Sequence, residues 1–152
     1  MVTTQLQIKD RLSDTCASHK MVRQVLYGFL TDVDDLPELD PPTIYIVPGL
    51  TTVPREGVFQ LNFQLICMDA LLPDKSNLED LLSDCHGILV DIYSKLLYID
   101  NNDTWSIQTG TTFTPFQERT KDYLAGYTMN LNILTFQSNC LTDLPFNSWY
   151  YN

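Results

Sequence analysis

The sequence predicts an α+β fold: a single domain with a small, mostly antiparallel sheet flanked by about two helices. Its 152 residues match the length of one ordinary domain, and 44% of them are hydrophobic, enough to fill a core. Two stretches alternate with the period of a strand, and two others repeat with the period of a helix. Strand-like runs with few helices favour a sheet that carries its helices on one face. We expect this domain to cover residues 1–152, with residues 140–152 as an aromatic C-terminal extension.

The first two expected elements are a helix and a strand. Residues 3–18 predict a helix with a thin apolar stripe that ends at Cys16, and either Thr3 or Thr4 can cap it. Residues 23–30 are rich in β-branched and aromatic side chains, which are typical of a strand.

Residues 31–42 predict an acidic, solvated loop. The segment contains three prolines and no basic residue, so it does not favour a helix or a strand. We expect its carboxylates to face solvent. They are Asp32, Asp34, Asp35, Glu38 and Asp40.

Two strands should follow. Residues 43–47 predict a short apolar strand that ends at Pro48-Gly49, and residues 50–56 predict a loop because they show little pattern around Pro54. Residues 59–67 then alternate apolar side chains with amides, which predicts a long strand with one core face and one water-facing amide face. From Leu65 to Met68 both sides become apolar, so we expect this end to be covered on both faces.

The main helix is predicted from about residue 76 to Leu97 or Tyr98. Apolar residues recur at every third or fourth position along it, so its apolar face should lie across the sheet. Ser76 and Glu79 fit a capping box at its start.

The last third of the chain predicts short strands, one long strand and a tail. After a turn at 100–103, residues 104–109 and 110–115 favour short strands or a hairpin. A polar connector at 117–123 leads to an alternating strand from Tyr127.

The net charge of −10 argues against a protein that grips DNA or RNA through phosphates. Such binding uses Lys and Arg, and this chain has only nine of these residues against nineteen Asp and Glu. No apolar run approaches the ~20 residues of a spanning helix, and the first residues lack the basic and apolar regions of a signal peptide. We therefore expect no membrane association, folding in a cytoplasm, and four cysteines that remain reduced and mostly fill apolar sites.

The residue types that carry catalysis or bind metals are not arranged for either. No two cysteines have zinc-site spacing, and Cys85 and His86 point about 100° apart on a helix, so only Cys85 joins the apolar stripe. No nucleophile elbow or phosphate-binding glycine loop is present. Acid–base chemistry would depend on His19, His86 or carboxylate pairs expected on solvated surfaces. We expect no catalytic residue, cofactor or metal, and no enzymatic activity.

Three surfaces favour contact with other proteins: the amide face, the segment 48–57 and the aromatic tail. Aromatic side chains bury large areas in interfaces at a small entropic cost. The candidate oligomer contacts are Leu50, Val53, Arg55, Phe146, Trp149, Tyr150 and Tyr151.

With these segments in order, the chain resembles the tail terminator and head–tail joining proteins of tailed phages, particularly the crAss-like type. The resemblance is carried by residues 42–48 (Pro-Thr-Ile-Tyr-Ile-Val-Pro), 68–69, 72–77 and 82–89, and by 115–119 and 122–127. Asn139-Cys140 and Leu144-Pro145 extend it into the tail.

The resemblance implies a structural virion protein without catalytic residues. Such proteins form closed homo-oligomeric rings, six- or twelve-fold, that join a portal or connector to the tail and leave a channel for transiting DNA. The acidic loop at residues 32–40 would then face either this channel or solvent. The chain would then be made in the host cytoplasm and reside in the neck or tail of the virion. An alternative is a small acidic cytoplasmic adaptor or inhibitor that mimics DNA. An enzyme is the third and weakest alternative.

Overall fold

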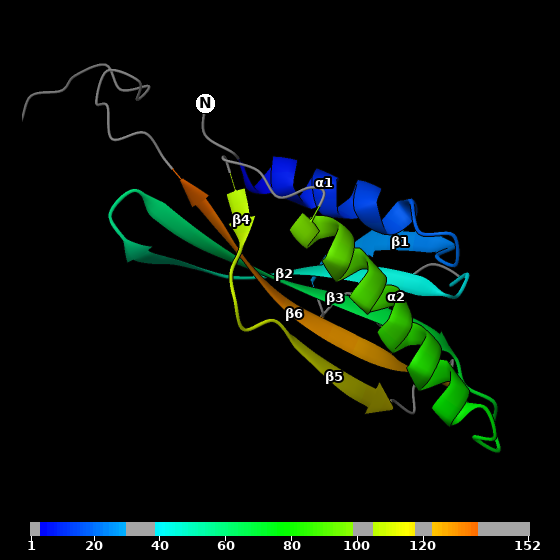
Figure 1. Cartoon of the computed structure of the whole chain (residues 1–152). Helices are drawn as coiled ribbons and strands as arrows, with labels where there is room; N and C mark the ends of the chain where they lie inside the picture. Colours follow the sequence, from blue (N-terminus) through cyan, green and yellow to red (C-terminus); the bar gives the residue numbers. More distant parts are fainter. Residues whose placement is uncertain (1–3, 30–38, 99–104, 118–122, 137–152) are drawn as a thin grey trace, which may run out of the picture.

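A six-stranded sheet covered on one face by two helices forms the domain (Figure 1). This computed structural model describes residues 4–29, 39–98, 105–117 and 123–136. The predicted α+β class is therefore confirmed. The elements in chain order are α1 (Gln5–Ala17), β1 (Gln24–Tyr27), β2 (Thr43–Arg55), β3 (Val58–Ala70), α2 (Leu78–Tyr98), β4 (Trp105–Ile107), β5 (Thr112–Gln117) and β6 (Leu124–Phe136).

The sheet is built around the long antiparallel pair β3 and β6, which stay in register from Val58↔Phe136 to Ala70↔Leu124. β2 lies antiparallel on the other side of β3, and the short β1 joins β2 in parallel. The sheet is thus mostly antiparallel, as predicted, with one parallel strand at its edge.

β2 corrects the prediction for residues 43–56. The expected strand stopped at Pro48 and was followed by a loop, whereas β2 continues through Pro48 and Pro54 to Arg55 and turns into β3 at Glu56-Gly57. Two register shifts interrupt the β2–β3 ladder, between Pro48 and Thr51 and between Thr52 and Arg55. β1 pairs only with the first part of β2, so proline can occupy the outer edge without removing a hydrogen bond to a described strand.

For residues 104–115 the sequence left two alternatives, short strands or a hairpin, and the structure shows short strands. β4 and β5 do not pair with each other. Both pair with β6, β4 at its end and β5 nearer its start. The sequence predicted two short strands correctly but not their common partner.

α1 has the capping predicted for it at one of the two threonines. The Thr4 hydroxyl accepts a hydrogen bond from the Gln7 amide (3.2 Å), and the Gln7 side chain accepts one from the Thr4 amide (2.8 Å). This reciprocal pair satisfies two amides at the start of the helix. α1 then buries Ile8, Leu12 and Cys16.

α2 ends at Tyr98, as predicted, but the predicted capping box at its start is wrong. The helix begins at Leu78, so the residue before it is Asn77 rather than Ser76. The Asn77 side chain instead accepts a hydrogen bond from the Leu72 amide (2.9 Å) and donates one to the Ala70 carbonyl (3.1 Å). It therefore fixes the turn that leads from β3 into the helix.

The main core lies between the helices and the sheet. Its centre joins Leu89 and Ile92 of α2 to Phe63 and Leu131, all at most 2% exposed. Each such side chain contributes about 1.5–3 kcal/mol when it leaves water. Cys16, Cys67 and Cys85 are buried in the same core, as expected, whereas Cys140 is outside the described residues.

A smaller cluster lies on the other face of the sheet. Tyr45, Val47, Met68 and Leu124 are buried there, with Ile66 partly buried against them. The prediction that the end of β3 is covered on both faces is thereby confirmed. The half of this face that contains the amides carries no such cluster among the described residues.

Candidate functional site

The hairpin formed by β2 and β3 is the most prominent contact surface of the described structure. Its turn extends beyond the two helices, and β6 accompanies it as far as Phe136 (Figure 1). β2 is buried from Thr43 to Val47 and exposed from Gly49 to Arg55. We call residues 48–60 of this hairpin the arm.

The arm presents apolar side chains to solvent. Leu50 is 76% exposed and Val53 is 59% exposed, and Arg55 is also exposed at its end. The two apolar residues belong to the part of β2 that extends past β1, which pairs with β2 only as far as Ile46. A strand edge with exposed apolar side chains is a surface on which another chain can dock.

Local geometry explains why the arm keeps its shape. Gly57 has φ 76°, a left-handed conformation that suits glycine in a tight hairpin turn. A side chain at Gly49 would collide with the amide of Asn62, so glycine allows the bulged part of β2 to cross close to β3. The bulge that gives the arm its bend therefore depends on a residue without a side chain.

The amide face predicted for β3 is partly internal rather than fully solvated. The Asn62 side-chain amide donates to the Asn130 side-chain oxygen (2.7 Å), to that of Asn132 (2.9 Å) and to the Leu131 carbonyl (3.4 Å). These side chains are half-buried and lie on the face away from the helices. The network links β3 to β6 at the base of the arm.

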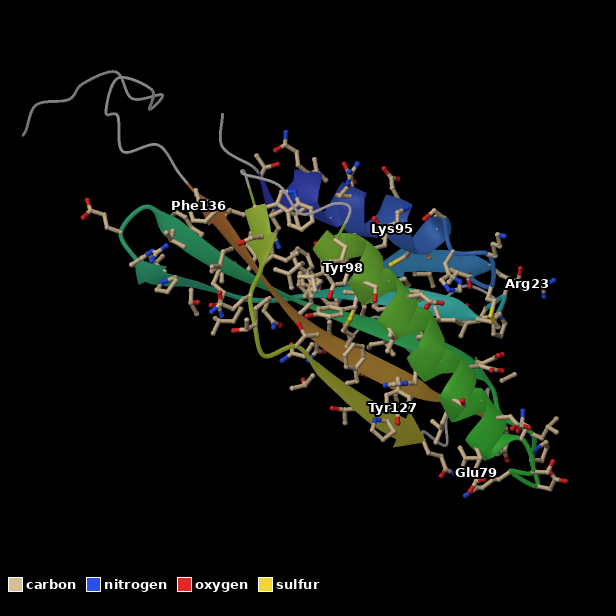
Figure 2. All side chains as sticks on the ribbon, viewed as in Figure 1. Arg23, Glu79, Lys95, Tyr98, Tyr127 and Phe136 are labelled. Carbon is tan, nitrogen blue, oxygen red and sulfur yellow. The ribbon has the colours of Figure 1, made fainter. Side chains whose placement is uncertain are left out.

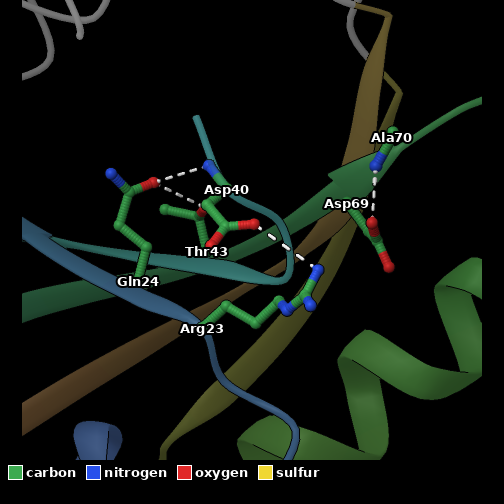
Figure 3. A network of polar contacts seen from close by, with 6 residues as sticks. All are labelled: Arg23, Gln24, Asp40, Thr43, Asp69 and Ala70. Carbon is green, nitrogen blue, oxygen red and sulfur yellow. Dashed lines mark hydrogen bonds and ion pairs between the residues drawn. The ribbon is translucent and has the colours of Figure 1, made fainter. Parts of the chain in front are cut away.

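Of the five carboxylates of the predicted acidic loop, only Asp40 lies within the described residues. Asp32, Asp34, Asp35 and Glu38 are outside the described residues. Asp40 lies next to β1, where its carboxylate is 3.5 Å from the Arg23 guanidinium (Figure 3).

Gln24 fixes this end of the loop to the sheet. Its side-chain oxygen accepts hydrogen bonds from the Asp40 amide and the Thr43 hydroxyl, both at 3.0 Å. The Asp40 carboxylate nevertheless remains 65% exposed. The loop therefore ends at a fixed, solvent-facing point beside β1.

The candidate contacts of the aromatic tail are outside the described residues. They are Phe146, Trp149, Tyr150 and Tyr151.

Both histidines are used in packing and capping. One imidazole nitrogen of His19 lies 2.9 Å from the Asp91 carboxylate, and the other accepts a hydrogen bond from the Met21 amide (3.1 Å). His86 lies at the edge of α2 against the rings of Phe113 and Tyr127. The described residues contain no group of three or more His, Cys, Asp or Glu side chains that could hold a metal ion.

Two of the buried thiols, Cys16 and Cys67, have a raised pKa and are protonated at neutral pH. Burial raises the pKa of Cys16 to about 12. A hydrogen bond with Cys85, together with burial, also raises the pKa of Cys67. A protonated thiol is a poor nucleophile and a poor metal ligand, so these positions favour packing over chemistry.

The paired carboxylates predicted to be solvated are indeed on the surface where they are described. Glu79 and Asp80 are exposed in the first turn of α2. Within the described ranges no helix is both long and apolar enough to cross a membrane.

No protein-family model and no curated protein matches this chain.

Proposed function

We propose that this chain is a structural subunit of a ring at the head–tail junction or upper tail of a phage. Copies of the chain would join the portal or connector to the tail around a channel through which DNA passes. Its partners would be itself and the neighbouring portal, connector or tail proteins. In this role the protein has no catalytic residues and needs no cofactor.

The single observation that carries the proposal is the arm. Leu50 and Val53 are exposed on a strand that extends beyond the helices, and a solitary subunit gains nothing from leaving them in water. Burying each of them against a neighbouring subunit contributes about 2 kcal/mol. Such an arm suits an assembly in which each subunit reaches the next.

The charge supports a channel that lets DNA slide. A surface with surplus carboxylates repels phosphates, so a duplex passing beside it is not held. The proposed channel-facing segment is the acidic loop around Asp40. A ring lined by basic residues, with residues 32–40 on its outside, would remove this part of the proposal.

The proposal is tested by particle assembly with arm variants. Particles made with Leu50→Asp and Val53→Asp together should accumulate as unjoined heads and tails, because two carboxylates prevent the arm from being buried. Tyr98→Asp is the matched control, since Tyr98 is 80% exposed at the end of α2 and away from the arm. Normal particles with the double variant would contradict the proposal.

The DNA-mimic alternative makes a different prediction. Such a protein would be absent from purified particles and would compete with DNA for a basic partner. Mass spectrometry of purified particles separates the two, because a ring subunit must be present in several copies per particle.

A further inference from the structure

A turn before α2 and a hollow beside its second half carry opposite charges, and both present apolar side chains. The Leu72 turn comprises residues 71–77, and Leu72 itself is 50% exposed. The hollow, of about 540 Å³, lies between the end of α1, the turn after it and α2. We call it the lysine hollow, and the residues that matter here are Lys20, Met21, Ile92 and Lys95.

The Leu72 turn is held rigidly with its apolar side chain outward. The Leu72 amide donates to the Asn77 side chain (2.9 Å), and the Leu72 carbonyl accepts from the Lys75 amide (2.8 Å). The Asp74 carboxylate accepts a hydrogen bond from the Ser76 amide (3.1 Å). A side chain presented by a fixed turn loses little entropy when it is buried by a partner.

The surroundings of the turn are strongly acidic. From residue 69 to residue 84 the chain has one lysine, Lys75, and five carboxylates. Glu79, Asp80 and Asp84 are exposed on the first two turns of α2. The Leu72 turn is therefore an apolar knob with negative charges around it.

The lysine hollow has the opposite character. Met21 and Ile92 give it an apolar lining, and Lys20 and Lys95 supply two positive charges against the one carboxylate of Asp91. In the described residues neither lysine takes part in an ion pair. The hollow can thus receive an apolar side chain that brings carboxylates with it.

The walls of the hollow are also fixed before any partner arrives. The Lys95 ammonium donates to the Ser18 hydroxyl (2.9 Å), which in turn donates to the Thr15 carbonyl (2.7 Å). The contact between His19 and Asp91 joins the same two segments. Both surfaces are therefore preformed, which lowers the cost of association.

The two surfaces cannot meet within one copy. Sixteen residues of a continuous helix separate Glu79 from Lys95, a distance of about 24 Å at the rise of an α-helix. Figure 2 places these residues toward opposite ends of α2. Two different patches that complement each other generate a head-to-tail contact, which closes into a ring when the rotation allows it.

We propose that the Leu72 turn of one copy docks in the lysine hollow of the next. This contact rests on the ring assembly proposed above and adds the pair of surfaces that joins neighbouring copies. Leu72 enters the hollow against Met21 and Ile92, while Glu79 and Asp80 approach Lys20 and Lys95.

Charge exchange tests the contact. In the first variant, Glu79→Lys and Asp80→Lys place two lysines opposite Lys20 and Lys95 and remove the net negative charge of residues 69–84. In the second, Lys20→Glu and Lys95→Glu make the hollow acidic like the turn. Each variant alone should associate at least about tenfold more weakly than the unaltered chain in sedimentation experiments at low salt, because like charges now meet. An equimolar mixture should associate again, since the unaltered turn of the second variant meets the unaltered hollow of the first, and the new lysines of the first meet the acidic hollow of the second.

Controls and outcomes separate this contact from the function. Asp10→Lys with Asp40→Lys changes the net charge as much as the first variant but leaves both surfaces intact, so association should persist. Leu72→Ser should weaken association without any change of charge. If the two charge variants associate as the unaltered chain does, or their mixture fails to recover, the contact is wrong. An unaltered chain that stays monomeric at every concentration would also overturn it. None of these results bears on the presence of the chain in particles, which tests the proposed function independently.

Discussion

Two glycines should respond in opposite directions to the same added methyl group. Gly126 lies in β6 opposite Met68 of β3, in the long strand pair at the centre of the sheet. Gly87 lies in the middle of α2. The substitutions Gly126→Ala and Gly87→Ala therefore test whether the strand register and the helix position are correct.

The structure sets the size of each effect. A methyl on Gly126 would overlap the Cys67 carbonyl oxygen and lie 2.9 Å from its carbon and 3.1 Å from the Met68 Cα. These are backbone atoms of a paired strand and cannot move aside without disturbing the ladder, so we expect a loss of about 3 kcal/mol. A methyl on Gly87 meets nothing within 4 Å. That helix should gain up to about 1 kcal/mol from the better propensity of alanine.

Thermal unfolding followed by circular dichroism measures both effects. For a chain of this length, 1 kcal/mol shifts Tm by roughly 2–4 °C. Gly126→Ala should therefore lower Tm by roughly 6–12 °C, and Gly87→Ala should raise it by roughly 2–4 °C. A Gly126→Ala protein as stable as the unaltered chain would refute the close approach of β6 to β3.

Three further predictions follow from the core and the amide network. Asn62→Ala should cost about 1–3 kcal/mol of unfolding free energy, because it leaves half-buried acceptors unpaired, and a double-mutant cycle with Asn132→Ala should show coupling. Leu89→Ala should cost about 2–5 kcal/mol in urea unfolding, because Leu89 is fully buried; a loss below about 1 kcal/mol would place it outside the core. In a Cys140→Ser background, a thiol reagent at pH 8 should leave the folded protein unlabelled, because Cys16, Cys67 and Cys85 are buried and burial raises the pKa of Cys16 to about 12; rapid labelling would contradict the burial of these thiols.

Elements with a strong internal period could be predicted from the sequence. β3 and α2 each bury one face, so apolar residues recur at every second position of β3 and at every third or fourth position of α2. Each pattern can be recognised in the sequence of that element alone. The helical core that joins Leu89 to the sheet follows from the same patterns. Capping at Thr4 was also local, since it depends on residues three positions apart.

β2 could not be predicted in full because its limits depend on distant strands. Pro48, Gly49 and Pro54 all disfavour a strand locally. They are tolerated because β1 is short and leaves the outer edge of β2 open, which is a property of the assembled sheet. The separate pairing of β4 and β5 with β6 is equally non-local.

The candidate site was likewise predictable only where it depends on local sequence. Leu50 and Val53 were predicted as contacts, and their exposure agrees with that role although the predicted loop is a strand. The lysine hollow was missed because it joins residues far apart in the chain, such as His19 and Asp91. The roles of the acidic loop and of the aromatic tail remain predictions.

The structure shows where part of the surplus of acidic residues lies. Among the described residues, carboxylates gather around the start of α2, while Lys20 and Lys95 lie beside its second half. The surplus of negative charge thus coexists with a positive hollow, and the proposed assembly uses both. In the proposed assembly the surplus would keep DNA mobile, and the local difference would orient the copies.

Imaging of the assembled particle tests the central proposal most directly. The proposed function predicts density for this chain in a closed ring at the head–tail junction or upper tail. In that density the arm with Leu50 and Val53 should be buried against a neighbouring subunit. Particles that are complete without this chain, or a chain found only outside them, would contradict the proposal.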